Sequence, residues 1–234
     1  NMLTAKTMRS FAMLFITAGM SCASLLSAVD LTVAAHGSPE TAAGAYSTPE
    51  EIMVELVNGN KRFLAGSLTN TDYARQIEMT RSMQRPHSVF LSCMDSRVPP
   101  EVIFDQGIGN IFVIRNAGNV EDENVLGSIE YAVKFAGARL IVVMGHSHCG
   151  AVSGAVKGVK SGNLTQLLKQ IQPCIPANIN YDGIVEVTAR NSVRKTMHDI
   201  VARSSTVKEM LAAKQIKLVG AFYDIETGEV EFIY

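Results

Sequence analysis

The sequence predicts an α/β fold with a mainly parallel central sheet, flanked by helices on both faces and ending in an antiparallel edge strand. Three short apolar runs, residues 89–91, 111–114 and 140–144, alternate with segments that show helical signals. Strands without polar alternation are typical of parallel sheets that are covered on both faces. Two runs near the C-terminus, residues 217–223 and 230–233, are separated by a short polar turn, which predicts a final antiparallel pair.

Thr48 begins the first predicted helix. Pro49 follows it directly and Glu51 stands three positions after it, an order that is typical of an N-cap, a first-turn proline and a capping box. The apolar face that continues from this start consists of Ile52, Leu56 and Phe63. Residues 58–60, Asn-Gly-Asn, interrupt that face.

The remaining predicted elements follow in chain order. They are a helix over 73–83, the first strand, a helical turn at 102–104, the second strand after a turn at 107–110, a helix over 124–136, the third strand, a helix that begins near 149, a loop over 173–183, a helix around 193–201 and the two final strands. The helix around 193–201 is predicted from apolar residues at i, i+4, i+7 and i+8. No internal linker divides these elements, so we expect residues 48–234 to form one catalytic domain.

Composition excludes some function classes. The chain has 234 residues, of which 47% are hydrophobic and 18% charged, enough for one domain with a sizeable core. The formal net charge of -1 argues against nucleic acid as a partner, because electrostatic binding of nucleic acid needs a basic surface.

The N-terminal segment has the order of a secretory signal peptide. Lys6 and Arg9 precede an apolar, acid-free stretch over 11–29, and small residues follow. We expect residues 1–35 to be the signal peptide and 36–47 a linker, with export to a bacterial periplasm and no stable membrane association after cleavage. The alternatives are an uncleaved membrane anchor, for which about 19 apolar residues just suffice, and a peptide that targets an organelle.

Reactive side chains follow two of the predicted strands. Cys93, Asp95 and Arg97 come after the first strand, and His146 and Cys149 come after the third. Ligands of open α/β sheets gather at the carboxyl ends of the strands, so we expect these groups to meet. Two thiolates and one imidazole suit zinc, and three protein ligands leave a fourth position for water. The sequence therefore predicts a zinc site.

The motifs around these residues resemble those of the β-class carbonic anhydrases. Cys-Met-Asp-Ser-Arg at 93–97 precedes Val-Pro, and Gly-His-x-x-Cys-Gly at 145–150 follows at a compatible spacing. The resemblance extends over most of residues 48–234. It includes Asn-Gly-Asn-Lys-Arg-Phe at 58–63, Phe-Val-Ile-Arg-Asn-Ala-Gly-Asn at 112–119 and Ala-Phe-Tyr-Asp at 221–224.

The resemblance implies a zinc enzyme that reversibly hydrates carbon dioxide to bicarbonate and a proton. Cys93, His146 and Cys149 would bind one Zn2+ per chain, and a zinc-bound hydroxide would attack the substrate. Two thiolates cancel the charge of the ion, so they acidify bound water less than three neutral histidines would. A helper is therefore expected: Asp95 orients the hydroxide, and Arg97 holds Asp95 ionised and in place.

The resemblance also implies a substrate pocket shared between subunits of a homodimer or tetramer, with the N-terminal helices packed on the partner subunit. Gln84 matches a glutamine that contacts substrate across the dimer interface. Phe112, Ala117 and Tyr131 match positions that line an apolar pocket, which suits carbon dioxide. The backbone amide of Gly150 is expected to contact bicarbonate.

Three further residues are not expected to bind the metal or the substrate, although His148 could relay protons. Phe90 stands where members regulated by a second bicarbonate site have tryptophan, so that regulatory site is not expected here. His148 is adjacent to Cys149 and is expected to face away from the metal. Cys174 lies in the proline-rich loop and is interpreted as a thiol outside the site.

Three other functions fit parts of the pattern. The same fold could hydrolyse carbon disulfide or carbonyl sulfide, which depends on access to the pocket. A zinc-binding module without catalysis would not require the Asp95–Arg97 pair. A phosphatase with a cysteine nucleophile places arginine six residues after the cysteine, whereas Arg97 follows Cys93 by four and Pro99 occupies the sixth place.

Overall fold

The computed structural model of this protein describes residues 46, 48–178 and 182–233. The predicted signal peptide, 1–35, and the predicted linker, 36–47 with the exception of residue 46, lie outside the described residues. Both assignments therefore stay predictions, and so does export. Within the described part of the chain, no helix combines the length and the apolar character needed to cross a membrane.

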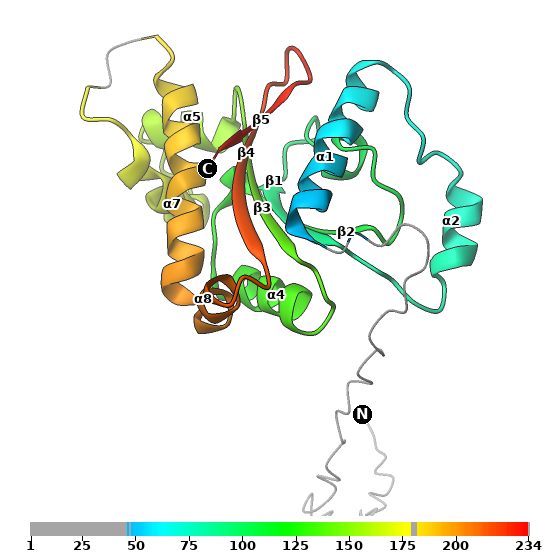
Figure 1. Ribbon diagram of the computed structural model, residues 1–234. Helices are drawn as coiled ribbons and strands as arrows, with labels where there is room; N and C mark the ends of the chain where they lie inside the picture. Colours follow the sequence, from blue (N-terminus) through cyan, green and yellow to red (C-terminus); the bar gives the residue numbers. More distant parts are fainter. Residues whose placement is uncertain (1–45, 47, 179–181, 234) are drawn as a thin grey trace, which may run out of the picture. The chain divides into compact units, whose positions relative to one another are not determined.

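A five-stranded sheet with the order β2-β1-β3-β4-β5 forms the centre of the fold (Figure 1). Its strands are β1 (Ser88–Cys93), β2 (Ile111–Asn116), β3 (Leu140–His146), β4 (Lys217–Tyr223) and β5 (Val230–Ile233). The first four are parallel, and β5 pairs antiparallel with β4. The predicted fold class is confirmed. Because β1 and β3 are neighbours, their carboxyl ends lie next to each other.

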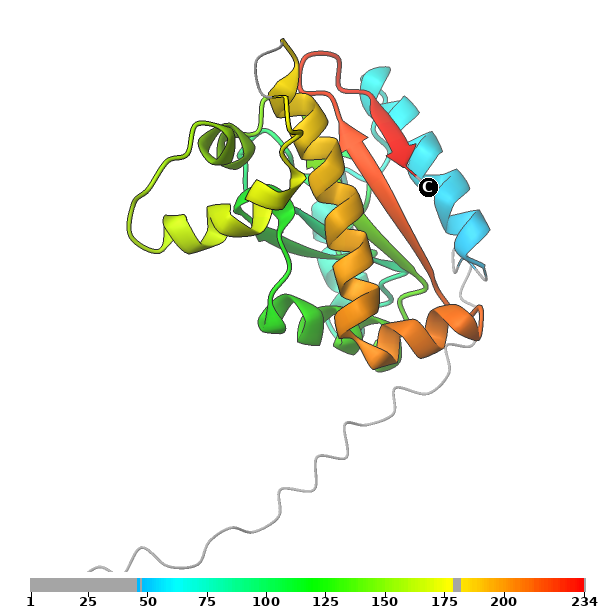
Figure 2. The ribbon, with the colours of Figure 1, turned by 90° about the vertical axis from the view of Figure 1, so that its left-hand side faces the viewer.

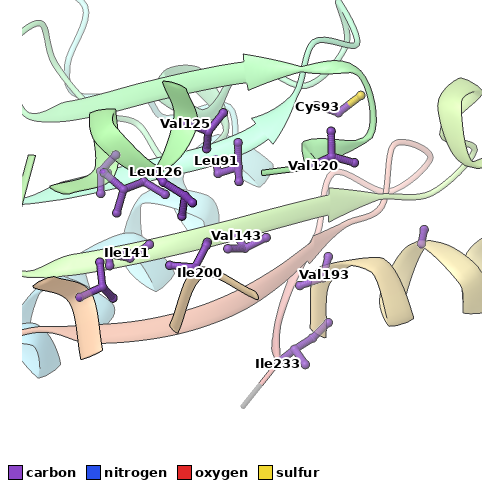
Figure 3. Close-up of a cluster of buried hydrophobic side chains, with 14 of the residues drawn as sticks. Leu91, Cys93, Val120, Val125, Leu126, Ile141, Val143, Val193, Ile200 and Ile233 are labelled. Carbon is purple, nitrogen blue, oxygen red and sulfur yellow. The ribbon is translucent and has the colours of Figure 1, made fainter. Parts of the chain in front are cut away.

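Helices cover both faces of the sheet (Figures 1 and 2). One face packs against α4 (Glu123–Lys134) and α7 (Ile184–Arg203), and the other against α1 (Pro49–Leu64) and α3 (Pro100–Ile103). Side chains alternate accordingly along β1: Leu91 belongs to the first core and Phe90 to the second. Figure 3 shows the first core, with Cys93 drawn at the carboxyl end of the strands.

Coverage is incomplete at one edge. Every residue of β1 and β3 is buried, whereas β2 has none that is fully buried. In a single chain β2 is covered on both faces only in part: Phe112 and Ile114 pack against the first core, and Ile111 and Val113 pack against the second. It is an edge strand, with β1 as its one neighbour in the described sheet.

Several helices differ from the sequence-based expectation. α6 (Leu164–Ile171) and α8 (Ser205–Ala212) were not predicted, although the apolar residues of α6 recur at helical spacing. α7 begins at Ile184, well before the predicted 193–201. Its first half was missed because two of its buried positions are the polar Thr188 and Ser192, which break the apolar pattern. α2 spans Tyr73–Thr80 and ends before the predicted residue 83. The helical turn predicted at 102–104 is α3, which begins at Pro100 and ends at Ile103.

The Asn-Gly-Asn interruption in α1 is a contact surface rather than a break. A Cβ atom at Gly59 would lie 1.9 Å from the carbonyl oxygen of Phe104, so only glycine permits this approach of α1 to the end of α3. Asn60 donates from Nδ2 to the Ile103 carbonyl at 3.2 Å and accepts from the Val230 N–H at 3.2 Å. These polar residues fix α1 to two other elements.

A buried carboxylate joins the segment after α1 to the end of α3. Asp105 accepts hydrogen bonds from Arg62 Nε at 2.5 Å and from the N–H groups of Thr69 and Asn70. Burial alone would raise the pKa of Asp105, but the bonds from Asn70, Arg62 and Thr69 outweigh it and lower this pKa to about 2.

We expect Asp105→Asn to lower the free energy of unfolding by about 2 kcal/mol at neutral pH. A carboxyl group whose folded pKa lies below its unfolded value stabilises the protein above the unfolded pKa, and this stabilisation is lost as the pH falls through the folded pKa. The difference in free energy of unfolding between wild type and variant should have its full size above about pH 5 and should shrink as the pH falls from about 4 toward 2. Urea unfolding across this range measures it, with Asp72→Asn as the control, because asparagine also caps helices well. A deficit that does not change with pH would contradict the assignment.

Candidate metal centre

Three predicted ligands converge at the carboxyl edge of the sheet. Cys93 ends β1, His146 ends β3, and Cys149 directly precedes α5 (Gly150–Val156). Their exposed fractions are 4%, 0% and 2%, and their ligand atoms all lie within 4.8 Å of one another. The expected meeting of the two strand ends is confirmed. It follows from the direct parallel pairing of β1 with β3.

The donor atoms fit a zinc ion. The two sulfur atoms are 3.9 Å apart, and tetrahedral zinc with ordinary Zn–S bonds separates two sulfurs by about 3.8 Å. His146 Nδ1 lies 2.8 Å from the carbonyl oxygen of Ser147, which only accepts, so Nδ1 bears the proton. His146 Nε2 is buried without a hydrogen-bond partner. A buried, unpaired lone pair is costly, and a metal ion would satisfy it.

The two thiols are free rather than joined in a disulfide. The hydrogen bond with Cys149 is the largest influence on Cys93 and lowers the pKa of its thiol. The same contact, together with burial, raises the pKa of Cys149. Adjacent thiolates repel each other, so ionisation of the first keeps the proton on the second. A dication bound to both sulfurs would remove that repulsion, which is a second reason why the pair fits a metal.

Asp95 lies beside this cluster and is held by Arg97. Arg97 Nε donates to Asp95 Oδ1 at 2.9 Å, and its terminal nitrogen donates to Oδ2 at 2.7 Å. These bonds hold the pKa of Asp95 well below its usual range. Asp95 Oδ2 is 4.0 Å from His146 Nε2. An oriented, ionised acceptor therefore lies next to the position that the unpaired imidazole nitrogen faces.

Arg115 on β2 holds the segment that contains these groups. Its Nε donates to the Cys93 carbonyl at 3.0 Å, and its terminal nitrogen donates to the Asp95 carbonyl at 2.5 Å. Sequence reasoning assigned it no part in the metal site. Arg115 is in register with Ser92, next to Cys93. This neighbourhood could not be predicted from the sequence, because it depends on the pairing of β1 with β2.

The Gly118 N–H was also missed. It lies 3.4 Å from Cys93 Sγ, within the 3-10 turn η1 (Ala117–Asn119). Nothing in its sequence position identifies glycine as a donor, because the group involved belongs to the backbone.

The residues after His146 are fixed by the C-terminal part of the chain. Ser147 donates from its backbone N–H to the Tyr223 carbonyl at 3.0 Å, and its hydroxyl donates to Asp224 at 3.3 Å. His148 Nε2 lies 3.1 Å from a carboxylate oxygen of Glu226. The prediction that His148 faces away from the cluster is confirmed, since that imidazole is exposed.

The predicted substrate residues are placed in three regions. Phe112 and Tyr131 have ring centres 6.3 Å apart and line a cavity of about 430 Å³ between β2 and α4. Ala117 begins η1, and Gly150 is the first residue of α5, directly after Cys149. Gln84 precedes β1, at the opposite end of that strand from Cys93. A single chain therefore does not bring Gln84 to the cluster, and these substrate roles stay predictions.

Comparisons with known proteins identify the family. A sequence profile described as carbonic anhydrase matches residues 88–230, which include every residue of the cluster. The solved structure of the β-carbonic anhydrase CcaA superposes with a TM-score of 0.63 and 27% identity, covering 78% of this chain and 87% of that chain. The chain belongs to the β-class carbonic anhydrases.

Two further relatives agree with this membership. Carbonic anhydrase 2 of Mycobacterium tuberculosis is 37% identical over 183 residues, which cover 74% of this β-carbonic anhydrase and 87% of that protein. A structure of tetrameric β-carbonic anhydrases from Sordaria macrospora matches with 26% identity and a TM-score of 0.62, covering 74% of this chain and 96% of that chain.

Proposed function

We propose that this chain catalyses the zinc-dependent, reversible hydration of carbon dioxide to bicarbonate and a proton. The observation that supports it most directly is the buried Cys-His-Cys cluster with an unpaired imidazole nitrogen 4.0 Å from the Asp95 carboxylate. Family membership supplies the reaction class, and the donor set supplies the choice of metal.

The residues of the cluster divide the work. Cys93, His146 and Cys149 would hold zinc, which when bound supplies the Lewis acidity that makes water nucleophilic near neutral pH. Asp95 stays ionised because Arg97 donates hydrogen bonds to both of its oxygens, so a free lone pair of the carboxylate would accept a hydrogen bond from the nucleophile and fix its direction. Arg115 fixes the backbone of Cys93 and Asp95 by donating a hydrogen bond to the carbonyl oxygen of each.

Metal analysis combined with stopped-flow carbon dioxide hydration tests the proposal. We expect about one zinc per chain, hydration that is lost when a chelator removes the metal, and recovery when zinc but not magnesium is added back. A preparation without zinc, or with zinc but no hydration at any pH up to about 9, contradicts it. Hydrolysis of carbonyl sulfide without hydration of carbon dioxide would favour the hydrolase alternative instead.

We also propose that the protein assembles as a homodimer or tetramer with active sites at the dimer interface. The edge strand β2 is only partly buried, and α2 has no buried residue while it exposes Tyr73 and Ile77. α1 buries one face on its own sheet, so a partner would meet α2 and the outer face of α1. A second copy is also what would bring a Gln84 to the cluster. Sedimentation of the purified protein distinguishes these assemblies from a monomer.

Export to a bacterial periplasm remains part of the proposal. It is supported by Lys6 and Arg9 ahead of the apolar stretch 11–29, the order that secretory leaders have. Mass spectrometry of the protein recovered from a periplasmic extract would show whether the N-terminus has been cleaved near residue 35.

A further inference from the structure

A left-handed turn presents a backbone N–H to one of the predicted metal ligands. Gly118 and Asn119 have φ angles of 75° and 47°, a region that costs free energy for residues other than glycine. A Cβ atom on Gly118 would lie 2.7 Å from Ile171 and 3.2 Å from Ala151. Only glycine therefore allows this amide to approach Cys93 Sγ to 3.4 Å.

Asn116 closes that turn with both ends of its side-chain amide. Nδ2 donates to the Val120 carbonyl at 2.7 Å, and Oδ1 accepts from the Val120 N–H at 3.1 Å. The main chain of Asn116 is anchored separately, because its carbonyl accepts from the Met94 N–H at 2.9 Å and it stands in register with Cys93. The side chain thus links the sheet to the far end of the turn.

We propose that Asn116 is a positioning residue of the metal centre. By closing the turn over residues 116–120, it holds the Gly118 N–H on the Cys93 sulfur and so sets how much electron density this thiolate gives to the metal. The inference rests on the proposed role of Cys93 as a zinc ligand. A hydrogen bond to a ligating thiolate weakens its donation and leaves the ion more acidic, and loss of such a partner typically costs about 10-fold to 100-fold in metal affinity or activity.

The variant Asn116→Ala tests this without relying on activity. Zinc affinity is measured by competition with a chelator, and the Co2+-substituted protein reports the sulfur-to-cobalt charge-transfer band. We expect zinc affinity to fall by about 10-fold to 100-fold, because the turn no longer holds the ligand in position. We expect the band to move to lower energy, because Cys93 without the Gly118 N–H is the more electron-rich sulfur. Asn116→Ser keeps an acceptor for the Val120 N–H and should restore most of the band position.

Asn191→Ala is the matched control. Asn191 Nδ2 donates to the Cys174 carbonyl at 3.1 Å, so this variant also loses an asparagine bond to the backbone, but away from the cluster. It should reduce thermal stability and leave the band and the zinc affinity unchanged. Equal shifts in both alanine variants, or no shift for Asn116→Ala, overturn the proposal. If Asn116→Ala does not fold, Asn116→Leu takes its place, because leucine is similar in size and also removes both bonds to Val120. An unshifted band and wild-type affinity in that variant overturn the proposal too.

The outcomes separate this inference from the proposed function. If the wild-type protein binds cobalt and Asn116→Ala shifts the band, but the wild-type protein does not hydrate carbon dioxide, the function is refuted and the positioning role is supported. A wild-type protein that binds neither zinc nor cobalt refutes both.

Discussion

Replacing Cys93 with serine is expected to empty the metal site. A neutral hydroxyl is a much poorer zinc donor than a thiolate, and Cys93 is one of three ligands that meet within 4.8 Å. We expect zinc to fall from about one per chain to a trace, with affinity reduced by more than the roughly 100-fold typical of outer partners. Carbon dioxide hydration should be lost with it. Elemental analysis after dialysis, with stopped-flow assays on the same sample, measures both.

Cys174→Ser provides the control for this experiment. Cys174 is also a buried free thiol, but it lies outside the cluster of described residues that could hold a metal. The control should retain zinc and activity, apart from a loss of stability caused by the buried hydroxyl. If Cys93→Ser keeps its zinc, or if both variants lose it equally, Cys93 is not a ligand.

Asp95→Asn should differ from Cys93→Ser in retaining zinc, although it too should lose rate. An amide of the same shape would direct its NH2 group at the Arg97 donors or at the nucleophile, so it cannot accept from both. In the wild-type protein the Arg97 guanidinium gives two hydrogen bonds to the carboxylate and the Arg97 backbone N–H gives a third. We expect the hydration rate to fall by about 100-fold or more, measured at saturating zinc over a range of pH.

Two results would contradict the role of Asp95. Equal loss of zinc in Asp95→Asn and Cys93→Ser would mean that Asp95 helps to bind the metal rather than to orient the nucleophile. An unchanged rate would mean that the Asp95–Arg97 pair is only structural. Asp122→Asn is the matched substitution, because Asp122 caps α4 through the Val125 N–H at 2.9 Å and asparagine can keep that bond.

Local sequence determined the fold class and the members of the cluster. The apolar runs of β1, β3 and β4 are buried almost throughout, and such runs indicate covered parallel strands without knowledge of any partner. Cys93, His146 and Cys149 could be assigned to one site because parallel strands present their carboxyl ends at one edge. These inferences need only the identities of neighbouring residues and a general rule of topology.

Pairing between distant segments decided the rest. The order β2-β1-β3 makes the two ligand-bearing strands neighbours and brings Arg115 and the Gly118 amide to Cys93, more than twenty residues away along the chain. The same order leaves Gln84 at the opposite end of β1. The first half of α7 was not predicted, because some of its buried positions are polar. Their burial depends on the sheet against which the helix packs. The sequence therefore predicts the metal ligands. The Gly118 amide and the Arg115 hydrogen bonds to backbone carbonyls reach Cys93 only after the strands pair.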